Sequence, residues 1–290
     1  MPKRLAFLGP PGTFSEEAAL LYDASADLVP VPSIPAVATA VLTGMAEEGI
    51  VPIENSLEGS VNETLDLLIQ EPHLRIWREV VLAISHCLLV KPGTRHTDIQ
   101  VIYSHPQALG QCRRYLESLF PKVKREPALS TVAAVEQALQ SSVPAGAIAP
   151  ARAAALYPVE VLAQGIQDNP NNFTRFVVLA HHDHPPTGDD KTSLAFTYDT
   201  DRPGLLHEAL GFFATRGINL AKIESRPTKQ VLGRYIFLLD LEGHRESPQV
   251  KAALDDLGRQ AAWVRVFGSY PRWRGPTQAR QGSPAGPASP

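Results

Sequence analysis

Thr174 and Arg175 place a hydroxyl and a permanent cation side by side, and both groups can take part in chemistry. They stand in the stretch QDNPNNFTRFVVLA, residues 167–180, where a segment rich in Asn, Asp and Pro meets an apolar run. This pattern predicts a turn followed by a buried strand. A hydroxyl can hydrogen-bond a departing oxygen, and a guanidinium can hold a carboxylate. The alternative is that the pair only ends a loop.

Two further stretches carry polar side chains directly after an apolar run. VPIENSLEGSV, residues 51–61, has a carboxylate, an amide and a hydroxyl in sequence, and YSHPQALGQC, residues 103–112, has an imidazole and two amides. The residues concerned are Glu54, Asn55, Ser56, His105, Gln107 and Gln111. If the runs are strands, these side chains line a cleft at the strand ends, and otherwise they are solvated loop residues. We assign His86, in ISHCLLV, to the core because its neighbours are apolar.

Helix-capping patterns follow a strand or turn at three points: GPPGTFSEEA, EGSVNETLDLL and LSTVAAVEQAL. The first two fit a capping box, in which a hydroxyl stands three residues before a carboxylate, namely Thr13 before Glu16 and Ser60 before Glu63. The hydroxyl residues that we place at the cleft are Thr13, Ser15, Ser130 and Thr131. Several helix starts around one cleft offer unpaired backbone N–H groups, which suit an anionic small molecule. The alternative is that they are ordinary caps.

The composition excludes several classes of partner. The 290 residues are 44% hydrophobic and 20% charged, and 27 basic against 30 acidic residues give a net charge of −3. No strong field therefore favours nucleic acid or a membrane surface, and no apolar run is long enough to cross a bilayer. The N-terminus has no secretion signal, and the two cysteines, Cys87 and Cys112, look like buried free thiols. We expect a cytoplasmic protein that acts on a small molecule or a protein.

The order of the elements predicts two domains. Residues 1–182 alternate short apolar runs with helical patterns, which is typical of an α/β fold with largely parallel strands. Residues 183–190 read as a flexible, solvated linker, residues 191–273 as a βαββαβ sandwich, and residues 274–290 as a disordered tail. We expect no metal at His181, His182 and His184, since their spacing fits no ligand set. Walker, dinucleotide and nucleophile-elbow motifs are missing, so we expect no cofactor.

Taken together, five stretches resemble the prephenate dehydratase family: GPPGTFSEEAA, VPIENSLEGSV, SHPQALGQC, IQDNPNNFTRF and IESRP. The resemblance implies a two-lobed, periplasmic-binding-protein-like catalytic domain that converts prephenate to phenylpyruvate. The family's Thr-Arg-Phe motif falls on Thr174, Arg175 and Phe176, which implies a catalytic role for them. Because the chain starts at the dehydratase strand, we expect no fused chorismate mutase. The resemblance leaves arogenate dehydratase open as an alternative, and so does a sensor that binds without turnover.

The second domain resembles an ACT module, which in this family senses phenylalanine. Gly204, Leu205, Leu206 and His207 stand where the family has Gly-Ala-Leu-Val, so the effector preference is open. The residues implied for the effector site are these four together with Asn219, Leu220, Glu224, Ser225 and Arg226. The resemblance also implies a homodimer or homotetramer that is paired through ACT domains.

These expectations combine into a mechanism. Arg175 and the helix starts hold the pyruvyl carboxylate of prephenate, while Thr174 hydrogen-bonds the departing ring hydroxyl. A threonine hydroxyl is too weak an acid to give up its proton unaided, so a neighbour relays the proton. His105, Glu54 and water remain open as that relay.

Overall fold

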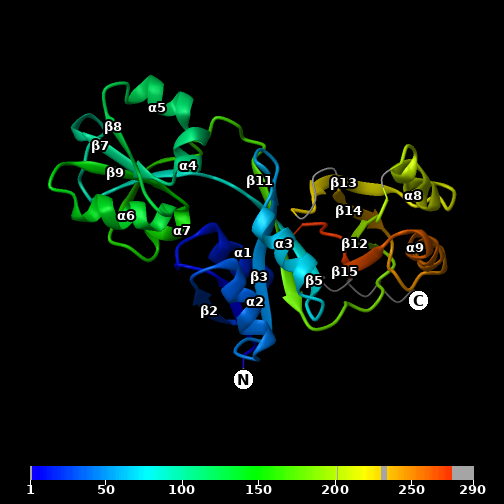
Figure 1. The fold of residues 1–290 in the computed structure, drawn as a ribbon. Helices are drawn as coiled ribbons and strands as arrows, with labels where there is room; N and C mark the ends of the chain where they lie inside the picture. The colour runs from blue at the N-terminus through cyan, green and yellow to red at the C-terminus, as the bar shows by residue number, and fades with distance from the viewer. Residues whose placement is uncertain (1, 201, 230–233, 276–290) are drawn as a thin grey trace, which may run out of the picture.

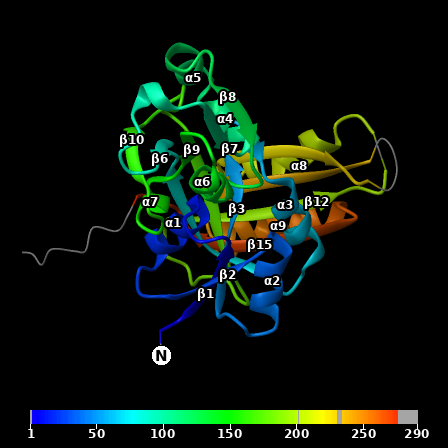
Figure 2. The ribbon, with the colours of Figure 1, turned by 90° about the vertical axis from the view of Figure 1, so that its left-hand side faces the viewer.

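The computed structural model describes residues 2–200, 202–229 and 234–275, which form two lobes and a C-terminal domain (Figure 1). The C-terminal domain and lobe 2 lie on different sides of lobe 1, and Figure 2 shows lobe 2 above lobe 1. The sequence thus predicts the α/β class correctly.

Lobe 1 is built from two separate parts of the chain. Its sheet has the order β2-β1-β3-β11-β5, and β4 pairs with β3. Its elements are β1 (Arg4–Leu8), α1 (Phe14–Tyr22), β2 (Asp27–Val31), α2 (Ile34–Leu42), β3 (Glu48–Asn55), β4 (Gly59–Ser60), α3 (Asn62–Gln70), β5 (Arg75–Ala83) and β11 (Phe173–Ala180). Strand β11 runs antiparallel to both of its neighbours, β3 and β5. The sheet is therefore mixed, and the expectation of largely parallel strands is wrong here.

Lobe 2 is one continuous stretch between the two parts of lobe 1. Its sheet has the order β10-β6-β9-β7-β8, in which β7 runs parallel to β8 and β9 while β6 runs antiparallel to β9 and β10. Its elements are β6 (Cys87–Val90), a 3-10 turn (His96–Asp98), β7 (Val101–Ser104), α4 (Pro106–Gln111), α5 (Arg113–Leu119), β8 (Lys124–Pro127), α6 (Thr131–Gln140), β9 (Ala145–Ala149), α7 (Ala151–Ala154) and β10 (Glu160–Gln164). The chain crosses between the lobes twice, at residues 84–86 and 165–172.

The C-terminal domain has the predicted order βαββαβ. Its antiparallel sheet, β13-β14-β12-β15, carries both helices on one face. Its elements are β12 (Asp190–Thr197), α8 (Leu205–Ala214), β13 (Leu220–Pro227), β14 (Tyr235–Glu242), α9 (Pro248–Gln260) and β15 (Trp263–Pro271). Of the predicted tail, residues 276–290 lie outside the described residues, while Arg274 pairs with Asp189 at 2.8 Å.

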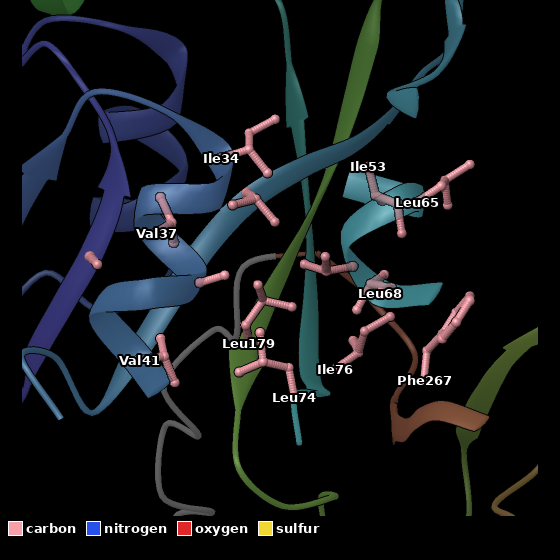
Figure 3. Close-up of a cluster of buried hydrophobic side chains, with 14 of the residues drawn as sticks. Ile34, Val37, Val41, Ile53, Leu65, Leu68, Leu74, Ile76, Leu179 and Phe267 are labelled. Atoms are coloured by element: carbon pink, nitrogen blue, oxygen red, sulfur yellow. The ribbon is translucent and has the colours of Figure 1, made fainter. Parts of the chain in front are cut away.

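The other face of this sheet packs on lobe 1 and shares its hydrophobic core. Phe267 of β15 belongs to the same buried cluster as Leu68 of α3 and Ile76 of β5, and lies beside them in Figure 3. The two backbones approach closely, because a Cβ on Gly268 would lie 2.7 Å from the backbone nitrogen of Ile76. The C-terminal domain is therefore packed on lobe 1 rather than loosely attached.

The segment between the domains is exposed at residues 185–189, as expected of a solvated linker, but the part before it makes specific contacts with lobe 1 and the C-terminal domain. The rings of His182 and His184 lie 4.8 Å and 4.6 Å from the ring of Trp77. A ring nitrogen of His184 is 3.1 Å from the guanidinium of Arg78, and Asp183 pairs with Arg245. The histidines thus stabilise the path of the chain over β5.

Candidate functional site

The cleft between the lobes encloses a cavity of about 420 Å³, which is a suitable size for a small ligand. Residues from the starts of α1, α4 and α6 line it, whereas Ser60 and Val61, before the start of α3, line only the adjoining opening. The predicted residues that line this cavity are Thr13, Ser15, Asn55, His105, Gln107, Gln111, Ser130, Thr131, Thr174 and Phe176. A wider opening of about 740 Å³ adjoins it and shares Asn55, His105, Gln107 and Gln111.

Of the predicted helix caps, the one at Ser130 forms, because its hydroxyl accepts a hydrogen bond from the Ala133 N–H at 3.0 Å. His105, which the sequence places at the cleft but not as a cap, also caps a helix, since its Nδ1 accepts the Gln107 N–H at 3.3 Å. Thr13 makes no cap hydrogen bond and donates instead to the Pro10 carbonyl at 3.0 Å.

Neither predicted capping box is present. Glu16 accepts the Gly12 N–H at 2.6 Å and pairs with Arg152 of lobe 2 at 3.1 Å, so it helps to hold the lobes together. The helix after Ser60 begins at Asn62, and its N-cap is Val61.

Thr174 lies at the centre of the cleft, where its hydroxyl contacts Asn55. The Asn55 side-chain amide donates to Thr174 Oγ1 at 2.9 Å. The orientation of that amide is fixed, because Asn55 Oδ1 accepts two backbone N–H groups, of Leu57 at 2.9 Å and Glu58 at 3.0 Å. Backbone N–H groups can only donate, so the NH₂ group must face Thr174.

This orientation propagates through two further amides. Asn55 Nδ2 also donates to Asn172 Oδ1 at 2.8 Å, and Asn172 Nδ2 donates to Gln111 Oε1 at 2.9 Å. Gln111 Oε1 is in turn 2.9 Å from His86 Nε2, so His86 must be the donor of that bond. The chain of hydrogen bonds crosses the hinge, since His86 and Asn172 stand on the two segments that connect the lobes.

His86 and Asn172 are site residues that the sequence analysis missed. Both are buried, and His86 lines the cavity. Burial lowers the pKa of His86 below its ordinary value, although the bond with Gln111 opposes this. The ring is therefore neutral at pH 7, with its proton on Nε2 and a bare, buried Nδ1 that has no partner among the described residues. The available signals in the sequence were the polar run before β11, in which Asn172 stands, and the lone histidine, His86, just before β6.

Arg175 does not line the cleft, which corrects the expectation that it anchors a substrate carboxylate. Successive side chains of a strand point to opposite faces, and Arg175 follows Thr174 directly. Its guanidinium lies 2.6 Å from Asp240 of the C-terminal domain and 3.1 Å from Glu54. Glu54 thus also faces the domain interface, where it lies 3.3 Å from Lys222.

Ser56 is likewise a structural residue rather than a cleft residue. Its hydroxyl donates to the Asn171 carbonyl at 3.1 Å and accepts the Phe173 N–H at 2.9 Å. It ties the loop after β3 to the start of β11.

The cleft is polar without carrying a basic side chain. Among the described residues, neither Arg nor Lys lines the cavity, and its polar groups are hydroxyls, amides, imidazoles and the N–H groups at the starts of α1 and α6. Its apolar wall includes Leu8, Phe14, Ile84 and Phe176. Such a site can bind carboxylates through neutral donors and helix N-termini.

The predicted effector residues fall into two groups. Gly204, Leu205, Leu206 and His207 line a pocket of about 270 Å³ at the start of α8. The structure does not bring Asn219, Leu220, Glu224, Ser225 and Arg226 into that pocket.

The side chains of β13 explain this division. Ser225 is exposed on the edge strand, whereas Glu224 accepts a hydrogen bond from Ser60 at 2.5 Å and Arg226 pairs with Asp66 at 2.8 Å. Glu224 and Arg226 therefore bind lobe 1, and Ser225 faces solvent.

Other groups that could do chemistry play no part in the cleft. Cys87 and Cys112 are buried free thiols, and burial raises the pKa of Cys112 to about 12. No group of three side chains suited to a metal ion occurs within residues 2–200, 202–229 and 234–275. No helix in the same ranges has both the length and the apolar character required to cross a membrane.

Comparisons with known proteins point to one family. The prephenate dehydratase family matches residues 5–184, and the ACT domain family matches residues 192–259. A bifunctional chorismate mutase/prephenate dehydratase of Pseudomonas aeruginosa is 42% identical over 272 residues, which cover 93% of this chain and 74% of the relative. A prephenate dehydratase of Mycobacterium marinum is 40% identical over 299 residues, covering 99% and 93%. The solved prephenate dehydratase of Arthrobacter aurescens, in complex with L-Phe, superposes with a TM-score of 0.86 at 38% identity and covers 93% and 90%.

Proposed function

The chain belongs to the prephenate dehydratase family and carries an ACT domain, so its reaction is the decarboxylating dehydration of prephenate, and we propose that Thr174 is the hydrogen-bond donor to the departing hydroxyl. In this reaction the bond between the ring and its carboxylate breaks, and its electrons complete the aromatic ring. The ring hydroxyl leaves and takes up a proton, which gives phenylpyruvate, carbon dioxide and water.

The observation that carries the proposal is the hydrogen bond from Asn55 to Thr174. Because Thr174 Oγ1 accepts from Asn55, its own O–H must point elsewhere. It donates to no group within the described part of the chain, so it is available to a ligand in the cleft. A bound hydroxyl would therefore find a donor that is already oriented, which is how an enzyme stabilises charge on a leaving oxygen.

The proton itself comes from a stronger acid than threonine. Two titratable side chains line the cavity, His86 and His105. The bare nitrogen of His86 is buried, whereas His105 is half-exposed and uses only Nδ1 for its cap. We assign His105 as the acid in its imidazolium form, in which Nδ1 also carries a proton and no longer accepts the Gln107 N–H, while Nε2–H donates directly or through water.

The carboxylates of prephenate are held differently from one another. The pyruvyl carboxylate suits the N–H groups and hydroxyls at the starts of α1 and α6, including Ser130 and Thr131. The ring carboxylate belongs against the apolar wall, near Phe14 and Phe176. A strong ion pair there would stabilise the ground state that must lose carbon dioxide.

Phenylalanine is the proposed effector, and the pocket of Gly204 to His207 is part of its site. In one protomer this pocket lacks the outward face of β13, where Ser225 and Ile223 are exposed. A second copy, related by a two-fold axis, would bring its β13 to this pocket and complete two equivalent sites. The proposal includes a homodimer or dimer of dimers and a cytoplasmic location, which the two free thiols favour.

The test is to incubate the purified protein with prephenate and follow phenylpyruvate, with and without phenylalanine. Formation of phenylpyruvate that phenylalanine suppresses supports the assigned reaction and its feedback regulation. Arogenate is assayed in parallel, and faster turnover of arogenate would assign the chain to that substrate. Binding of prephenate without any product would mean that the cleft is a sensor.

A further inference from the structure

A buried ion cluster joins the strand of Thr174 to the ACT domain. At its centre is Arg175, whose guanidinium lies 2.6 Å from Asp240, 3.1 Å from Glu54 and 3.4 Å from Glu79. Burial alone would lower the pKa of Arg175, but Asp240 and the other anionic neighbours raise it. The guanidinium is thus a permanent charge held between two domains.

Three ion pairs of this cluster cross the interface, namely Arg175 with Asp240, Lys191 with Glu79 and Lys222 with Glu54. We call the interface ion cluster the seven residues Arg175, Glu54 and Glu79 of lobe 1 and Lys191, Lys222, Glu224 and Asp240 of the ACT domain. Lobe 1 thus contributes one cation and two anions, and the ACT domain contributes two cations and two anions. Because buried charges must be paired, each side depends on the other.

Asp240 is itself held firmly. Its second oxygen accepts a hydrogen bond from Ser193 at 2.5 Å, and the Ser193 hydroxyl is 2.5 Å from the Tyr270 hydroxyl. These residues come from three neighbouring strands of the ACT sheet, β14, β12 and β15. Burial alone would raise the pKa of Asp240, but Arg175, Ser193 and Lys191 hold it below its ordinary value.

Arg175 is placed where its position decides that of Thr174. The two residues are consecutive in β11, and the register with β3 shifts between Arg175 and Phe176. At this bulge Arg175 faces Glu54 and Phe176 faces Pro52, so β3 has one extra residue. Bulges next to active sites set the direction of side chains. This bulge bends β3, beside its pairing with Arg175. A pull on the Arg175 side chain reaches Thr174 through the peptide bond that joins the two residues in β11.

We propose that Asp240 of the ACT domain, acting through Arg175, is a positioning residue for Thr174. The proposal rests on the function proposed above, since it concerns the group that we assign to the departing hydroxyl. It makes the ACT domain a structural part of the active site, in addition to the carrier of the effector pocket.

The experiment uses the full chain and two variants. Asp240→Asn keeps the shape of the side chain and removes its charge. Arg175→Met combined with Asp240→Asn removes one cation and one anion, so that the net charge of the cluster is unchanged and Lys191 and Lys222 remain beside Glu79 and Glu54. Replacing both partners of a buried pair preserves stability better than replacing one.

We expect Asp240→Asn to lower kcat for prephenate by about tenfold or more, with KM changed less than about threefold, because a small misplacement of a reacting group acts on kcat. The double variant should recover the thermal midpoint of the parent but not its kcat. Recovery of both would show that the pair is only structural and would overturn the proposal, as would a folded Asp240→Asn with the kcat of the parent. If the single variant does not fold, the double variant decides.

The matched control is Asp66→Asn, which breaks another domain-crossing ion pair, with Arg226, away from β11. This control variant should keep kcat within about twofold of the parent. A tenfold loss of kcat would mean that any weakened contact between the domains lowers activity, and it would overturn the specific role of Asp240. A crystal structure of the double variant gives a reading that needs no substrate. The contact between Thr174 Oγ1 and Asn55 Nδ2 should lengthen beyond about 3.5 Å, and an unchanged contact would overturn the proposal whatever the parent turns over.

Discussion

Thr174 and Arg175 are consecutive residues of β11, and their side chains serve two different partners across the thickness of one sheet. The Thr174 hydroxyl is 2.9 Å from the Asn55 amide in the cleft, while the Arg175 guanidinium is 2.6 Å from Asp240 of the ACT domain. A strand alternates its side chains in this way, so one dipeptide can connect a reaction site to a regulatory domain.

Removal of the Thr174 hydroxyl should act on catalysis rather than on binding. Thr174→Val and Thr174→Ala are expected to lower kcat by on the order of 10² or more with little change in KM, because the donor acts on the leaving oxygen. Thr174→Ser keeps the donor and should lose far less. Steady-state kinetics with prephenate measure this, and equal activity of the serine and valine variants would remove Thr174 from the mechanism.

Asn55→Asp tests the direction of the hydrogen bond to Thr174. A carboxylate still accepts the Leu57 and Glu58 N–H groups but cannot donate, so the Thr174 hydroxyl would turn toward it and away from the substrate. We expect kcat to fall by about 10²-fold and the thermal midpoint to fall as well, because the carboxylate can no longer donate to the buried Asn172 Oδ1. Asn171→Asp, an exposed change in the connecting segment 165–172, is the control for added negative charge. Parent-like kcat in Asn55→Asp would contradict the mechanism.

The buried His86 predicts a loss of stability in mild acid. Burial lowers its folded-state pKa below the ordinary value of 6.5, so between these two values the unfolded chain binds more protons than the folded one. The contribution of neutral His86 to the free energy of unfolding is complete above pH 6.5, and it is lost as the pH falls from 6.5 through the folded-state pKa. Urea unfolding from pH 7.5 to 5.5 should show this decrease in the parent and a smaller one in His86→Asn, which keeps a donor toward Gln111. Identical pH profiles would exclude His86 as the cause.

Glu224 and Ser225 should affect inhibition by phenylalanine in different ways. Ser225 is exposed beside the proposed subunit contact, so Ser225→Ala is expected to weaken binding of phenylalanine in calorimetry. Glu224 contacts Ser60 of lobe 1, so Glu224→Gln should retain binding within a few-fold yet weaken inhibition of turnover. The reverse pattern would mean that Glu224, rather than Ser225, touches the effector.

Gly268 should tolerate no side chain. A Cβ at this position would meet backbone atoms of Ile76, which cannot move aside as a flexible side chain does, so we expect Gly268→Ala to destabilise the protein by about 1–3 kcal/mol. Gly258→Ala is the control, because this glycine lies inside α9 with nothing within 4 Å of the added atom. The control should be neutral or slightly stabilising. Thermal unfolding compares the two, and equal midpoints would argue against the close contact of β15 with β5.

Local patterns were enough to predict much of the cleft. Ser130 and His105 stand where a strand passes into a helix, and the caps they form depend on their immediate neighbours. The position of Arg175 could also have been derived, because a strand that turns Thr174 to the cleft must turn its neighbour away. The Thr-Arg-Phe motif of the family led us to assign both residues to the cleft, although adjacent residues of a strand face opposite sides.

Other features depend on contacts between distant parts of the chain. His86 and Asn172 meet through Gln111 only because both connections between the lobes pass the same point. One feature of the sequence does indicate that the ACT sheet is covered on both faces. The run YIFLLDL in β14 is apolar on both faces, whereas a strand with one face in solvent would alternate apolar and polar residues. No local pattern says which surface covers the second face.

The division of lobe 1 into two segments has a consequence for how the protein is made. Lobe 2, residues 87–164, is continuous and can fold as soon as it leaves the ribosome, whereas β3 and β5 must wait for β11, which lies almost a hundred residues after β5, to join them. Until then the first eighty or so residues expose two unpaired strand edges, which are open to aggregation or to a chaperone. The strand that carries Thr174 is thus also the one that closes the sheet, and the nascent chain acquires its reacting hydroxyl and its stable N-terminal lobe in the same step.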